Sequence, residues 1–591
     1  MRRTAYTIAL VLALLSPFLV SAVAQAESAS LQLTPPRVTW GESQRASGLV
    51  AADQPCAAGR AVALERRETG ATVWEDIDST TSGDDGTFTF TFTAPTNAAY
   101  RAVVQAGLLG SVTCNEIDSA AAKGTVLAKV SLTAGRARIH AGDCVRLTSV
   151  VQPVKQGQDV RVQERSAAGW RTVSSATLDA SSRAVDDRCF AWTGIGSHRF
   201  RMLWPKQDDL NAPGASRTVS IQVLRAPWMQ RIDALTAGRT VGVSIRAAGR
   251  VLYERAGQVP LIPASNEKLL LSMALLDRMD PTLRIPTIAA APKLGGHGVV
   301  HGNLWILGRG DPSIGKGDIV ELAKAIVAAG VHRITGRVMG STSYFAHDWF
   351  ARGWKPEFPK EELGLPSALT FRENHIDGRN PHDPERFAAE ALTRRLRAGG
   401  VRVHGSPGSG SAPGALRQIA AIQSPPLAGL MTQMDQTSDN FFAEVLGKVL
   451  GVSVAGVPGT IAKGAGAIRG FAARHGVHLG AYDSSGLSYA NRVSPDGVTK
   501  LLEYAARAEW GDTLLDVLAS PGEGTLEDRL HGVQVHAKTG TLEDISALSG
   551  FVWVGKLQAW AEFSILDRGM CSCRSKPMED AIVRTIAKAA R

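Results

Sequence analysis

Residues 27–225 contain short segments in which hydrophobic and polar residues alternate. The clearest is Thr87–Thr93, where threonine and phenylalanine alternate so that every second side chain can face a core. Turn-forming residues such as Asp84, Asp85 and Gly86 separate these segments. A two-residue period is typical of half-buried antiparallel strands, so the pattern predicts an all-β region.

A weak internal repeat divides this region into two similar β modules, residues 27–125 and 126–225. Gly59–Arg67 resembles Gly157–Arg165, which begins 98 positions later. Each module has about a hundred residues, one internal pair of cysteines and one tryptophan near its middle, Trp74 or Trp170. These features resemble immunoglobulin-like sandwiches, although the cysteines do not occupy matching positions in the repeat.

After residue 225 the pattern changes to helical stretches mixed with strands bounded by glycine, which predicts an α/β domain. Helices are expected at Leu269–Met279 and Phe441–Leu450, and adjacent strands at Gly550–Val554 and Gln558–Leu566. Residues 291–420 have strands of their own and a Gly/Ser/Pro-rich link, and we interpret them as an inserted β-rich subdomain. Residues 226–290 and 421–591 would then form the α/β domain around it.

The first 26 residues have the features of a secretory signal peptide. Arg2 and Arg3 precede an apolar run from Thr4 to Val23, and small residues end it at Ala26. An uncleaved membrane anchor is the alternative, but Pro17 and the small-residue end favour cleavage. No later stretch is apolar enough to span a bilayer, so the mature chain is expected to be secreted or periplasmic, without a transmembrane anchor.

The composition then limits the classes of partner. With 44% hydrophobic and 20% charged residues, the 591-residue chain is neither wholly disordered nor a polytopic membrane protein. Its formal net charge of +10 favours anionic surroundings. Because the chain is expected outside the cytoplasm, anionic cell-wall polymers or phospholipid head groups are better candidates than nucleic acid.

The six cysteines form three local couples. In an oxidising compartment we expect the disulfides Cys56–Cys114 and Cys144–Cys189. Cys571 and Cys573 are separated by one residue, so a bridge between them would be strained. That couple stays open between a bridge, free thiols and an intermolecular bond.

A candidate nucleophile and base lie at the start of the first predicted helix. Ser265 and Lys268 are three residues apart, which places them on one face of its first turn. A serine hydroxyl needs a base to remove its proton, and a lysine can serve if its pKa is lowered. Serine and lysine at this spacing usually lie on a solvated face, so the motif alone is a weak signal.

Two further motifs follow in the chain. In Ser438-Asp439-Asn440 the serine hydroxyl can relay protons, and the Asn440 amide offers a donor and an acceptor to a peptide. In the strand-like segment from Lys538 to Thr541 the lysine supplies positive charge, and Gly540 leaves room for a substrate beside the strand. Each tripeptide can arise by chance, but the ordered set of three is a strong signal.

The three motifs resemble those of the penicillin-binding proteins and serine β-lactamases, Ser-x-x-Lys, Ser-x-Asn and Lys-Thr-Gly. Other segments make the resemblance closer to the class C low-molecular-mass penicillin-binding proteins, the D-alanyl-D-alanine carboxypeptidase/endopeptidase family: Gly308–Ser313, Pro366–Leu369, Asp483–Ser488 and Gly524–Leu526. The resemblance covers residues 235 to 570 approximately and leaves out both β modules. Lys268 and Ser438 are 170 positions apart, which is less than we expect for that family and predicts that one accessory subdomain is reduced or absent.

The resemblance implies an exported serine peptidase that cleaves the terminal D-Ala-D-Ala bond of peptidoglycan stem peptides and that β-lactam antibiotics inhibit covalently. Ser265 would form the acyl-enzyme, Lys268 would be the acylation base, and Ser438 would pass the proton to the departing amine. Asn440 would hold the peptide amide. Lys538 with Thr539 would bind the terminal carboxylate or polarise Ser438. The backbone N–H groups of Ser265 and Thr541 would form the oxyanion hole.

No cofactor or metal is expected. His301 and His536 lack the spacing of metal ligands, and Asp311, within Gly-Asp-Pro, is interpreted as a turn residue. The balance between carboxypeptidase and endopeptidase action stays open. The alternatives are a β-lactamase or esterase of the same fold, and a catalytically weak wall-binding scaffold. For the β modules the alternatives are wall or glycan binding and a spacer role, and the absence of an aromatic cluster favours the spacer.

Overall fold

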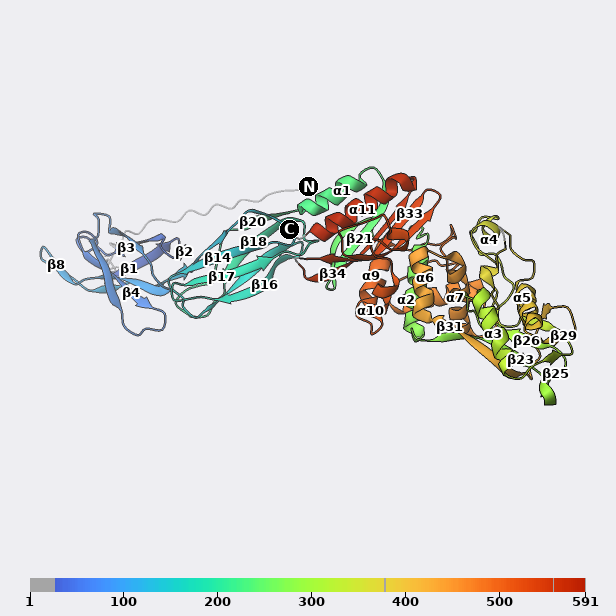
Figure 1. The fold of residues 1–591 in the computed structure, drawn as a ribbon. Helices are drawn as coiled ribbons and strands as arrows, with labels where there is room; N and C mark the ends of the chain where they lie inside the picture. Colours follow the sequence, from blue (N-terminus) through green and yellow to red (C-terminus); the bar gives the residue numbers. More distant parts are fainter. Residues whose placement is uncertain (1–26, 377–378, 556, 590–591) are drawn as a thin grey trace, which may run out of the picture. The chain divides into compact units, whose positions relative to one another are not determined.

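The computed structural model describes residues 27–376, 379–555 and 557–589, which form two compact units (Figure 1). The first unit ends at Leu224, and the second begins at Arg225 and also takes in Ala191–Thr193. Within the described residues, no helix is long and apolar enough to cross a membrane. The predicted signal peptide, residues 1–26, lies outside them.

The first module is a sandwich of two β-sheets. One sheet has the order β1-β3-β6, and the other has the order β2-β11-β7-β4-β5, with β10 beside β7 and a separate hairpin β8-β9. The strands are β1 (Ser28–Thr34), β2 (Arg37–Thr39), β3 (Ser43–Ala51), β4 (Ala61–Glu68), β5 (Glu75–Thr81), β6 (Thr87–Thr93), β7 (Ala98–Val104), β8 (Gly107–Leu109), β9 (Val112–Cys114), β10 (Ile117–Asp118) and β11 (Ala122–Leu127). Phe88 and Phe90 of β6 are buried in a core shared with Leu64 and Tyr100 of the other sheet. The alternating segment Thr87–Thr93 thus forms the predicted strand.

The second module repeats this strand order, as the sequence repeat predicts. Its sheets are β12-β14-β17 and β13-β20-β18-β15-β16, with β19 beside β18. The strands are β12 (Lys129–Ala134), β13 (Arg138–His140), β14 (Cys144–Gln152), β15 (Asp159–Ser166), β16 (Gly169–Thr177), β17 (Arg183–Cys189), β18 (Gly196–Trp204), β19 (Gly214–Ala215) and β20 (Val219–Leu224). Most pairs are antiparallel, but β2 runs parallel to β11 and β13 parallel to β20. The antiparallel pairing that alternation indicates is thus present in most of each module, and the two short edge strands β2 and β13 pair in parallel.

The tryptophans that supported the immunoglobulin resemblance lie outside the core. Trp74 and Trp170 are only half-buried, whereas Tyr100, Phe200 and Trp204 are the large aromatic side chains buried completely. Arginine side chains lie over both tryptophans, since Arg67 and Arg101 are each 4.7 Å from the centre of the Trp74 ring. The rings therefore belong to the surfaces of the modules.

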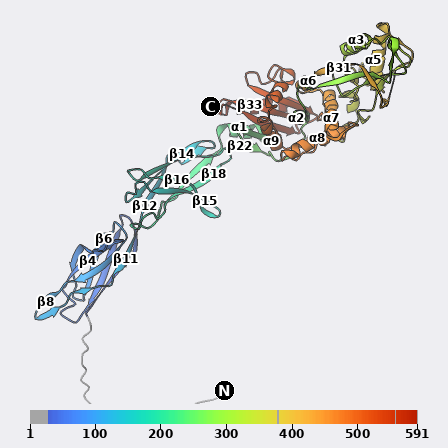
Figure 2. The ribbon, with the colours of Figure 1, turned by 90° about the horizontal axis from the view of Figure 1, so that it is seen from below.

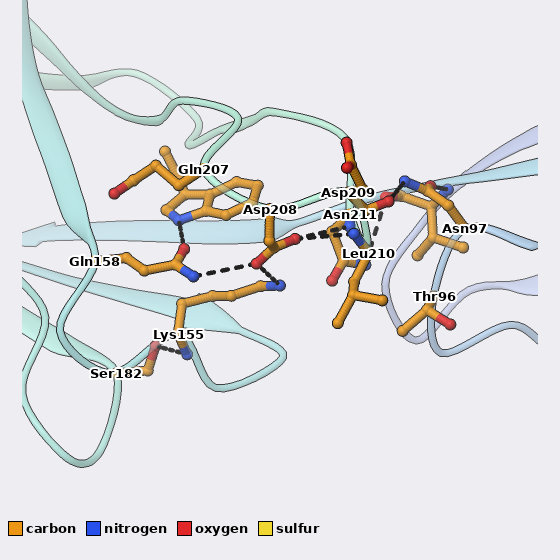
Figure 3. Close-up of polar contacts among 12 residues, drawn as sticks. Thr96, Asn97, Lys155, Gln158, Ser182, Gln207, Asp208, Asp209, Leu210 and Asn211 are labelled. Carbon is orange, nitrogen blue, oxygen red and sulfur yellow. Dashed lines mark hydrogen bonds and ion pairs between the residues drawn. The ribbon is translucent and has the colours of Figure 1, made fainter. Parts of the chain in front are cut away.

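Hydrogen bonds join the two modules around Asn97 and the segment 208–212 (Figure 3). Asn97 donates from its backbone N–H to the carbonyl of Leu210 (2.7 Å) and from its side chain to that of Asp209 (2.9 Å). Asp208 fixes the segment to the second module by accepting from Lys155 Nζ at 2.7 Å. The segment 208–212 is therefore fixed within the second module while it bonds to Asn97 of the first.

The predicted disulfides Cys56–Cys114 and Cys144–Cys189 are both present. The second joins neighbouring strands of one sheet, because Cys144 of β14 and Cys189 of β17 are paired in the strand register. Cys571 and Cys573 are also bonded to each other, which selects the bridge among the three alternatives for this couple.

A five-stranded antiparallel sheet, in the order β22-β21-β34-β33-β32, organises the second unit. Its strands are β21 (Thr240–Ala247), β22 (Arg250–Arg255), β32 (Val535–Leu542), β33 (Ile545–Val554) and β34 (Ala559–Arg568). The helices α1 (Pro227–Thr236) and α11 (Ser572–Lys588) lie together along this sheet (Figure 1), and α9 (Pro495–Ala505) packs on β21 and β34. The strand β32, which carries the Lys-Thr-Gly motif, is at one edge.

A helical layer follows the sheet. It contains α2 (Asn266–Arg278), α6 (Leu427–Thr437), α7 (Asn440–Ala455), α8 (Ile461–Arg474) and α10 (Gly511–Val517), with a 3₁₀ turn at Gly524–Leu526. The predicted helices are confirmed as α2 and α7. All positions from Asn266 to Leu276 of α2 are buried, so the helix that carries Lys268 passes through the core of the unit.

The insertion between the first two motifs is mixed rather than β-rich. Two sheets, β30-β28-β26-β23-β31 and β24-β25-β27-β29, pack with helices α3 and α5 at the end of the unit farthest from the five-stranded sheet (Figures 1 and 2). The elements are β23 (Arg284–Ala291), β24 (Leu294–Gly295), a 3₁₀ turn (Gly296–Gly298), β25 (Val299–Val300), β26 (Leu304–Leu307), α3 (Lys316–Ala328), β27 (Arg333–Ile334), β28 (Val338–Ser341), α4 (Phe358–Glu361), a second 3₁₀ turn (Arg372–Asn374), α5 (Pro384–Ala398), β29 (Arg402–Val403), β30 (Gly408–Gly410) and β31 (Arg417–Pro426). The strands β23 and β31, which lead into and out of the insertion, pair with each other. A reduced accessory subdomain stays a prediction.

Candidate active site

Ser265 and Lys268 meet at the start of α2, as their spacing predicts. Ala264 has a φ of 46°, and this left-handed residue turns the chain sharply into the helix. Ser265 is half-buried and precedes the helix, while Lys268 is completely buried. The Nζ of Lys268 donates to the Oγ of Ser265 at 3.2 Å, so the predicted nucleophile and the predicted base are in direct contact.

Two other acceptors hold the Lys268 ammonium. Its Nζ lies 2.7 Å from the side-chain oxygen of Asn440 and 2.6 Å from the carbonyl oxygen of Ser485. Burial lowers the pKa of Lys268 to about 8, against the opposing influence of nearby carboxylates, of which Asp439 is the strongest. A fraction of the lysine is therefore neutral and able to accept a proton at physiological pH.

The junction of α6 and α7 presents the second motif. Ser438 ends α6 with a left-handed backbone (φ 62°, ψ 38°), and the side chain of Asp439 caps α7 by accepting from the N–H of Phe442 at 2.9 Å. This sharp change of direction brings both Ser438 and Asn440 to the cleft that Ser265 lines. Asn440 Nδ2 donates to the carbonyl of Glu362 at 3.2 Å, which fixes its amide.

The third motif lies on the edge strand β32. Lys538 is completely buried, and its pKa is lowered by burial first and by the charge of Lys268 second. The two ammonium groups repel each other, so a charge on either lysine disfavours a charge on the other. Thr539 contacts Thr525 through their hydroxyl groups at 2.8 Å.

Gly540 allows β32 to approach the nucleophile. A Cβ atom at this position would lie 2.9 Å from the carbonyl oxygen of Pro263 and 3.1 Å from the backbone nitrogen of Ser265. The absence of a side chain therefore keeps the strand close to Ser265. Among the described residues, the outer edge of β32 is contacted by an isolated bridge between Ala519 and Ala537 and by no further strand.

A cleft of about 410 Å³ brings the three motifs together. Of the predicted site residues, those that line it are Ser265, Ser438, Asn440, Thr539, Gly540 and Thr541. Lys268 and Lys538 lie beneath its surface, because both are completely buried. The cleft also contains three cations that sequence reasoning missed, Lys355, Arg529 and Lys576. Thr525 also lines the cleft, and the Gly524–Leu526 segment already marked it in the sequence. The three cations belong to no sequence motif.

Glu444 supports the carbonyl that holds Lys268. It lies one helical turn after Asn440 on α7, and its Oε1 accepts from the N–H groups of Ser484 (2.9 Å) and Ser485 (2.7 Å). All three residues are buried. Glu444 therefore fixes the turn whose Ser485 carbonyl contacts the Lys268 ammonium.

Gly486 continues this turn with a φ of 88°. A Cβ atom there would lie 2.0 Å from the carbonyl oxygen of Ala264, the residue before the nucleophile. Since carbon and oxygen cannot approach so closely, only glycine fits this crossing of two chain segments.

The other candidates have structural surroundings. Asp311 accepts hydrogen bonds from the backbone and hydroxyl of Ser313 (2.9 and 2.6 Å), as expected of a turn residue. His536 packs against Trp560 and lies 3.2 Å from the Ser520 hydroxyl. Among the described residues, no group of three His, Cys, Asp or Glu side chains is arranged to hold a metal ion.

A serine nucleophile, a buried lysine and an edge strand beside them define a serine hydrolase of the acyl-enzyme type. The sequence profile of the D-Ala-D-Ala carboxypeptidase 3 (S13) family matches residues 229–377 and 364–589. The chain belongs to this family, which confirms its resemblance to the class C low-molecular-mass penicillin-binding proteins.

Two curated relatives each match a little over half of the chain. A D-alanyl-D-alanine carboxypeptidase from Actinomadura sp. strain R39 is 26% identical in an alignment 447 residues long, which covers 60% of this chain and 82% of that protein. The carboxypeptidase DacB of Mycolicibacterium smegmatis is 30% identical in an alignment 381 residues long, which covers 58% of this chain and 79% of that protein. The structure of penicillin-binding protein 4 from Haemophilus influenzae matches with a TM-score of 0.52 at 20% identity, over 60% of this chain and 98% of its own.

Proposed function

We propose that the protein is an exported serine-type D-Ala-D-Ala carboxypeptidase that trims peptidoglycan stem peptides, with endopeptidase action on cross-links as a second use of the same site. The observation that carries the proposal is the 3.2 Å contact between Ser265 Oγ and the buried Lys268 Nζ, in a cleft that Ser438, Asn440 and Thr539 also line. Membership of the carboxypeptidase family supports the same reaction.

The acylation step uses these contacts. Neutral Lys268 takes the proton of Ser265 Oγ as the oxygen attacks the carbonyl carbon of the penultimate D-alanine. The backbone N–H groups of Ser265 and Thr541 stabilise the oxyanion. The C–N bond then breaks, and the proton reaches the departing amine through Ser438. Water later cleaves the ester on Ser265 and releases the shortened stem peptide.

The binding residues follow from the third motif. The substrate lies along the outer edge of β32 as an added strand, and Gly540 leaves room for its backbone. Asn440 holds the peptide amide, and Thr539 binds the terminal carboxylate. Lys538, which is buried beneath the cleft, supplies positive charge to that carboxylate or polarises Ser438. A β-lactam is attacked by Ser265 in the same way and leaves a covalent adduct.

The domain organisation belongs to the proposal as well. A signal peptide (1–26) precedes β modules 27–125 and 126–225, and residues 226–290 with 421–591 form the peptidase domain around the insertion 291–420. The strand order of the two sheets supports an immunoglobulin-like assignment for the modules, whereas Trp74 and Trp170, which lie on the surface, do not contribute to it.

Intact-mass spectrometry of the mature protein after incubation with penicillin tests the proposal. We expect one penicilloyl adduct that maps to Ser265 and is absent from Ser265→Ala, together with release of D-alanine from a stem-peptide substrate. Penicillin recovered intact, with no adduct, would indicate the wall-binding scaffold. Rapid hydrolysis of penicillin without a lasting adduct would indicate a β-lactamase.

A further inference from the structure

The outer face of the sheet β13-β20-β18-β15-β16 carries a group of arginines. The residues that alternate inward along its strands, such as Ile139, Val162 and Phe200, are buried. The strand register places five arginines on the opposite face: Arg138 on β13, Arg199 and Arg201 on β18, and Arg161 and Arg165 on β15. All but the half-buried Arg201 are exposed.

These arginines have no carboxylate partner within the described residues. Arg201 donates instead to the amide oxygen of Gln163 at 2.9 Å, and its guanidinium carbon lies 4.5 Å from the centre of the Trp170 ring. Two carboxylates are near: Asp159 accepts from the Thr177 hydroxyl at the end of β15, and Glu164 alternates to the other side, where it contacts His198. The positive charge of the face is therefore left available.

On the equivalent face of the first module, the arginine that corresponds to Arg201 is paired with carboxylates. Arg101 corresponds to Arg201 and has carboxylate oxygens of Glu65 and Asp118 at 2.5 Å each. The position of Glu65, which pairs with Arg101 in the strand register, is occupied in the second module by Gln163, which pairs with Arg201. Ala63 and Ala99 stand where the second module has Arg161 and Arg199.

The net charges of the two modules follow the same contrast. Residues 27–125 contain 7 Lys and Arg against 12 Asp and Glu, whereas residues 126–225 contain 15 against 8. Two modules with the same strand order thus have opposite signs, −5 and +7. A spacer role does not require the two modules to differ in charge. A difference in charge is required if only one module attracts an anionic partner.

The geometry of the face suits a linear partner. Neighbouring strands are about 4.8 Å apart, so the five strands from β13 to β16 span about 20 Å. The cations on this face are all arginines, whose planar guanidinium groups bind phosphate oxygens in pairs and stay charged at every physiological pH. The one large aromatic side chain of the face, Trp170, lies against Arg165 and Arg201, which leaves it poorly placed to enter a lipid layer.

We propose that this outer face of the second module is a docking surface for a linear polymer of phosphodiesters attached to the cell wall. The polymer lies across the strands, and Arg138, Arg161, Arg165 and Arg199 bind successive phosphate groups. The cell-wall origin of the polymer rests on the proposed peptidase function, whereas the arginine surface itself does not.

Binding of the full-length mature protein to poly(glycerol phosphate) tests the proposal. The triple variant Arg161→Gln, Arg165→Gln, Arg199→Gln removes three charges from the docking face. The matched control Arg37→Gln, Arg67→Gln, Lys123→Gln removes three charges from the same face of the first module. Thermal unfolding and D-alanine release from a stem peptide check that both variants keep their fold and their peptidase site.

We expect the first variant to lose about 100-fold in affinity at low salt, since each cation near a phosphate-rich surface contributes about fivefold. The control should change by less than about threefold. Equal losses in both variants, or none in either, would overturn the proposal. So would equal binding of a carboxylate polymer such as polyglutamate, or tighter binding to anionic phospholipid vesicles. If peptidase activity is absent but the first variant alone loses binding, the docking surface stands and only the cell-wall origin fails.

Discussion

The peptidase cleft and the outer face of the second module both gather positive side chains, but they treat them in opposite ways. Lys268 and Lys538 are completely buried and have lowered pKa values, so they can give up a proton. Arg138, Arg161 and Arg199 are exposed and remain charged. Burial thus turns a cation into a reagent, while exposure keeps it as a source of attraction that salt weakens.

Removing the buried cation should have the largest effect. We expect Lys268→Met to slow acylation by penicillin about 10²- to 10⁴-fold, because a general base contributes on this scale. Time-resolved mass spectrometry of the adduct measures the rate. Lys324→Met, at an exposed position on α3, is the control and should change the rate less than twofold. Acylation of Lys268→Met within tenfold of the natural protein would remove lysine from the mechanism.

The second largest expected difference between the two regions is their response to salt concentration. Four arginine contacts to phosphates predict about a 50-fold fall in polymer affinity between 50 and 200 mM salt, by release of bound counterions. Acylation should change less than about twofold, because the contact between Ser265 and Lys268 is shielded from solvent ions. Titrations and acylation rates at matched salt concentrations check both. A salt-independent polymer affinity would show that the arginines are not the binding groups.

Acylation in the cleft and polymer binding on the arginine face should also differ in their dependence on pH. Acylation needs neutral Lys268, whose pKa is about 8, so the rate should rise with pH and be about tenfold higher at pH 9 than at pH 7. Polymer binding should vary less than twofold over the same range, since arginine does not titrate there. A flat pH profile of acylation would contradict the base role of Lys268.

Substitutions of Glu444 test whether its charge affects the pKa of Lys268. Its carboxylate fixes the Ser484-Ser485 turn and is among the groups that raise the pKa of Lys268. Glu444→Gln keeps an acceptor oxygen but removes the charge, so the rising limb of the pH profile should move to lower pH, by up to about one unit. Glu444→Ala also removes the acceptor and should slow acylation about fivefold. A merely structural role would lower the melting temperature in both variants and leave the limb unmoved.

Local patterns predicted much of the catalytic unit. The three-residue spacing of Ser265 and Lys268 sets their contact, because a helix turn imposes it. The β6 strand and the disulfide Cys56–Cys114 were likewise readable from alternation and from cysteine placement. In each case the information lies within one element or one short loop.

Contacts between distant elements could not be read in this way. Ser485 contacts Lys268 from a part of the chain far from α2, and Glu444 acts on Lys268 through Ser485. The Asp483–Ser488 segment marks Ser485 in the sequence, but no motif marks Glu444. The docking face is invisible without strand register, since a shift of one residue would turn its arginines to the core. The surface position of Trp170 depends on the same register.

The close approach of Gly486 to Ala264 limits which substitutions the enzyme can accept during evolution. Any residue other than glycine at position 486 would push its Cβ into the Ala264 carbonyl and displace the segment that presents Ser265. A bacterial population under selection by penicillin can vary the side chains that line the cleft, and many such alleles would still fold. Because every substitution at codon 486 would disturb the segment that presents Ser265, we expect variants that stay active to differ at other positions of the cleft.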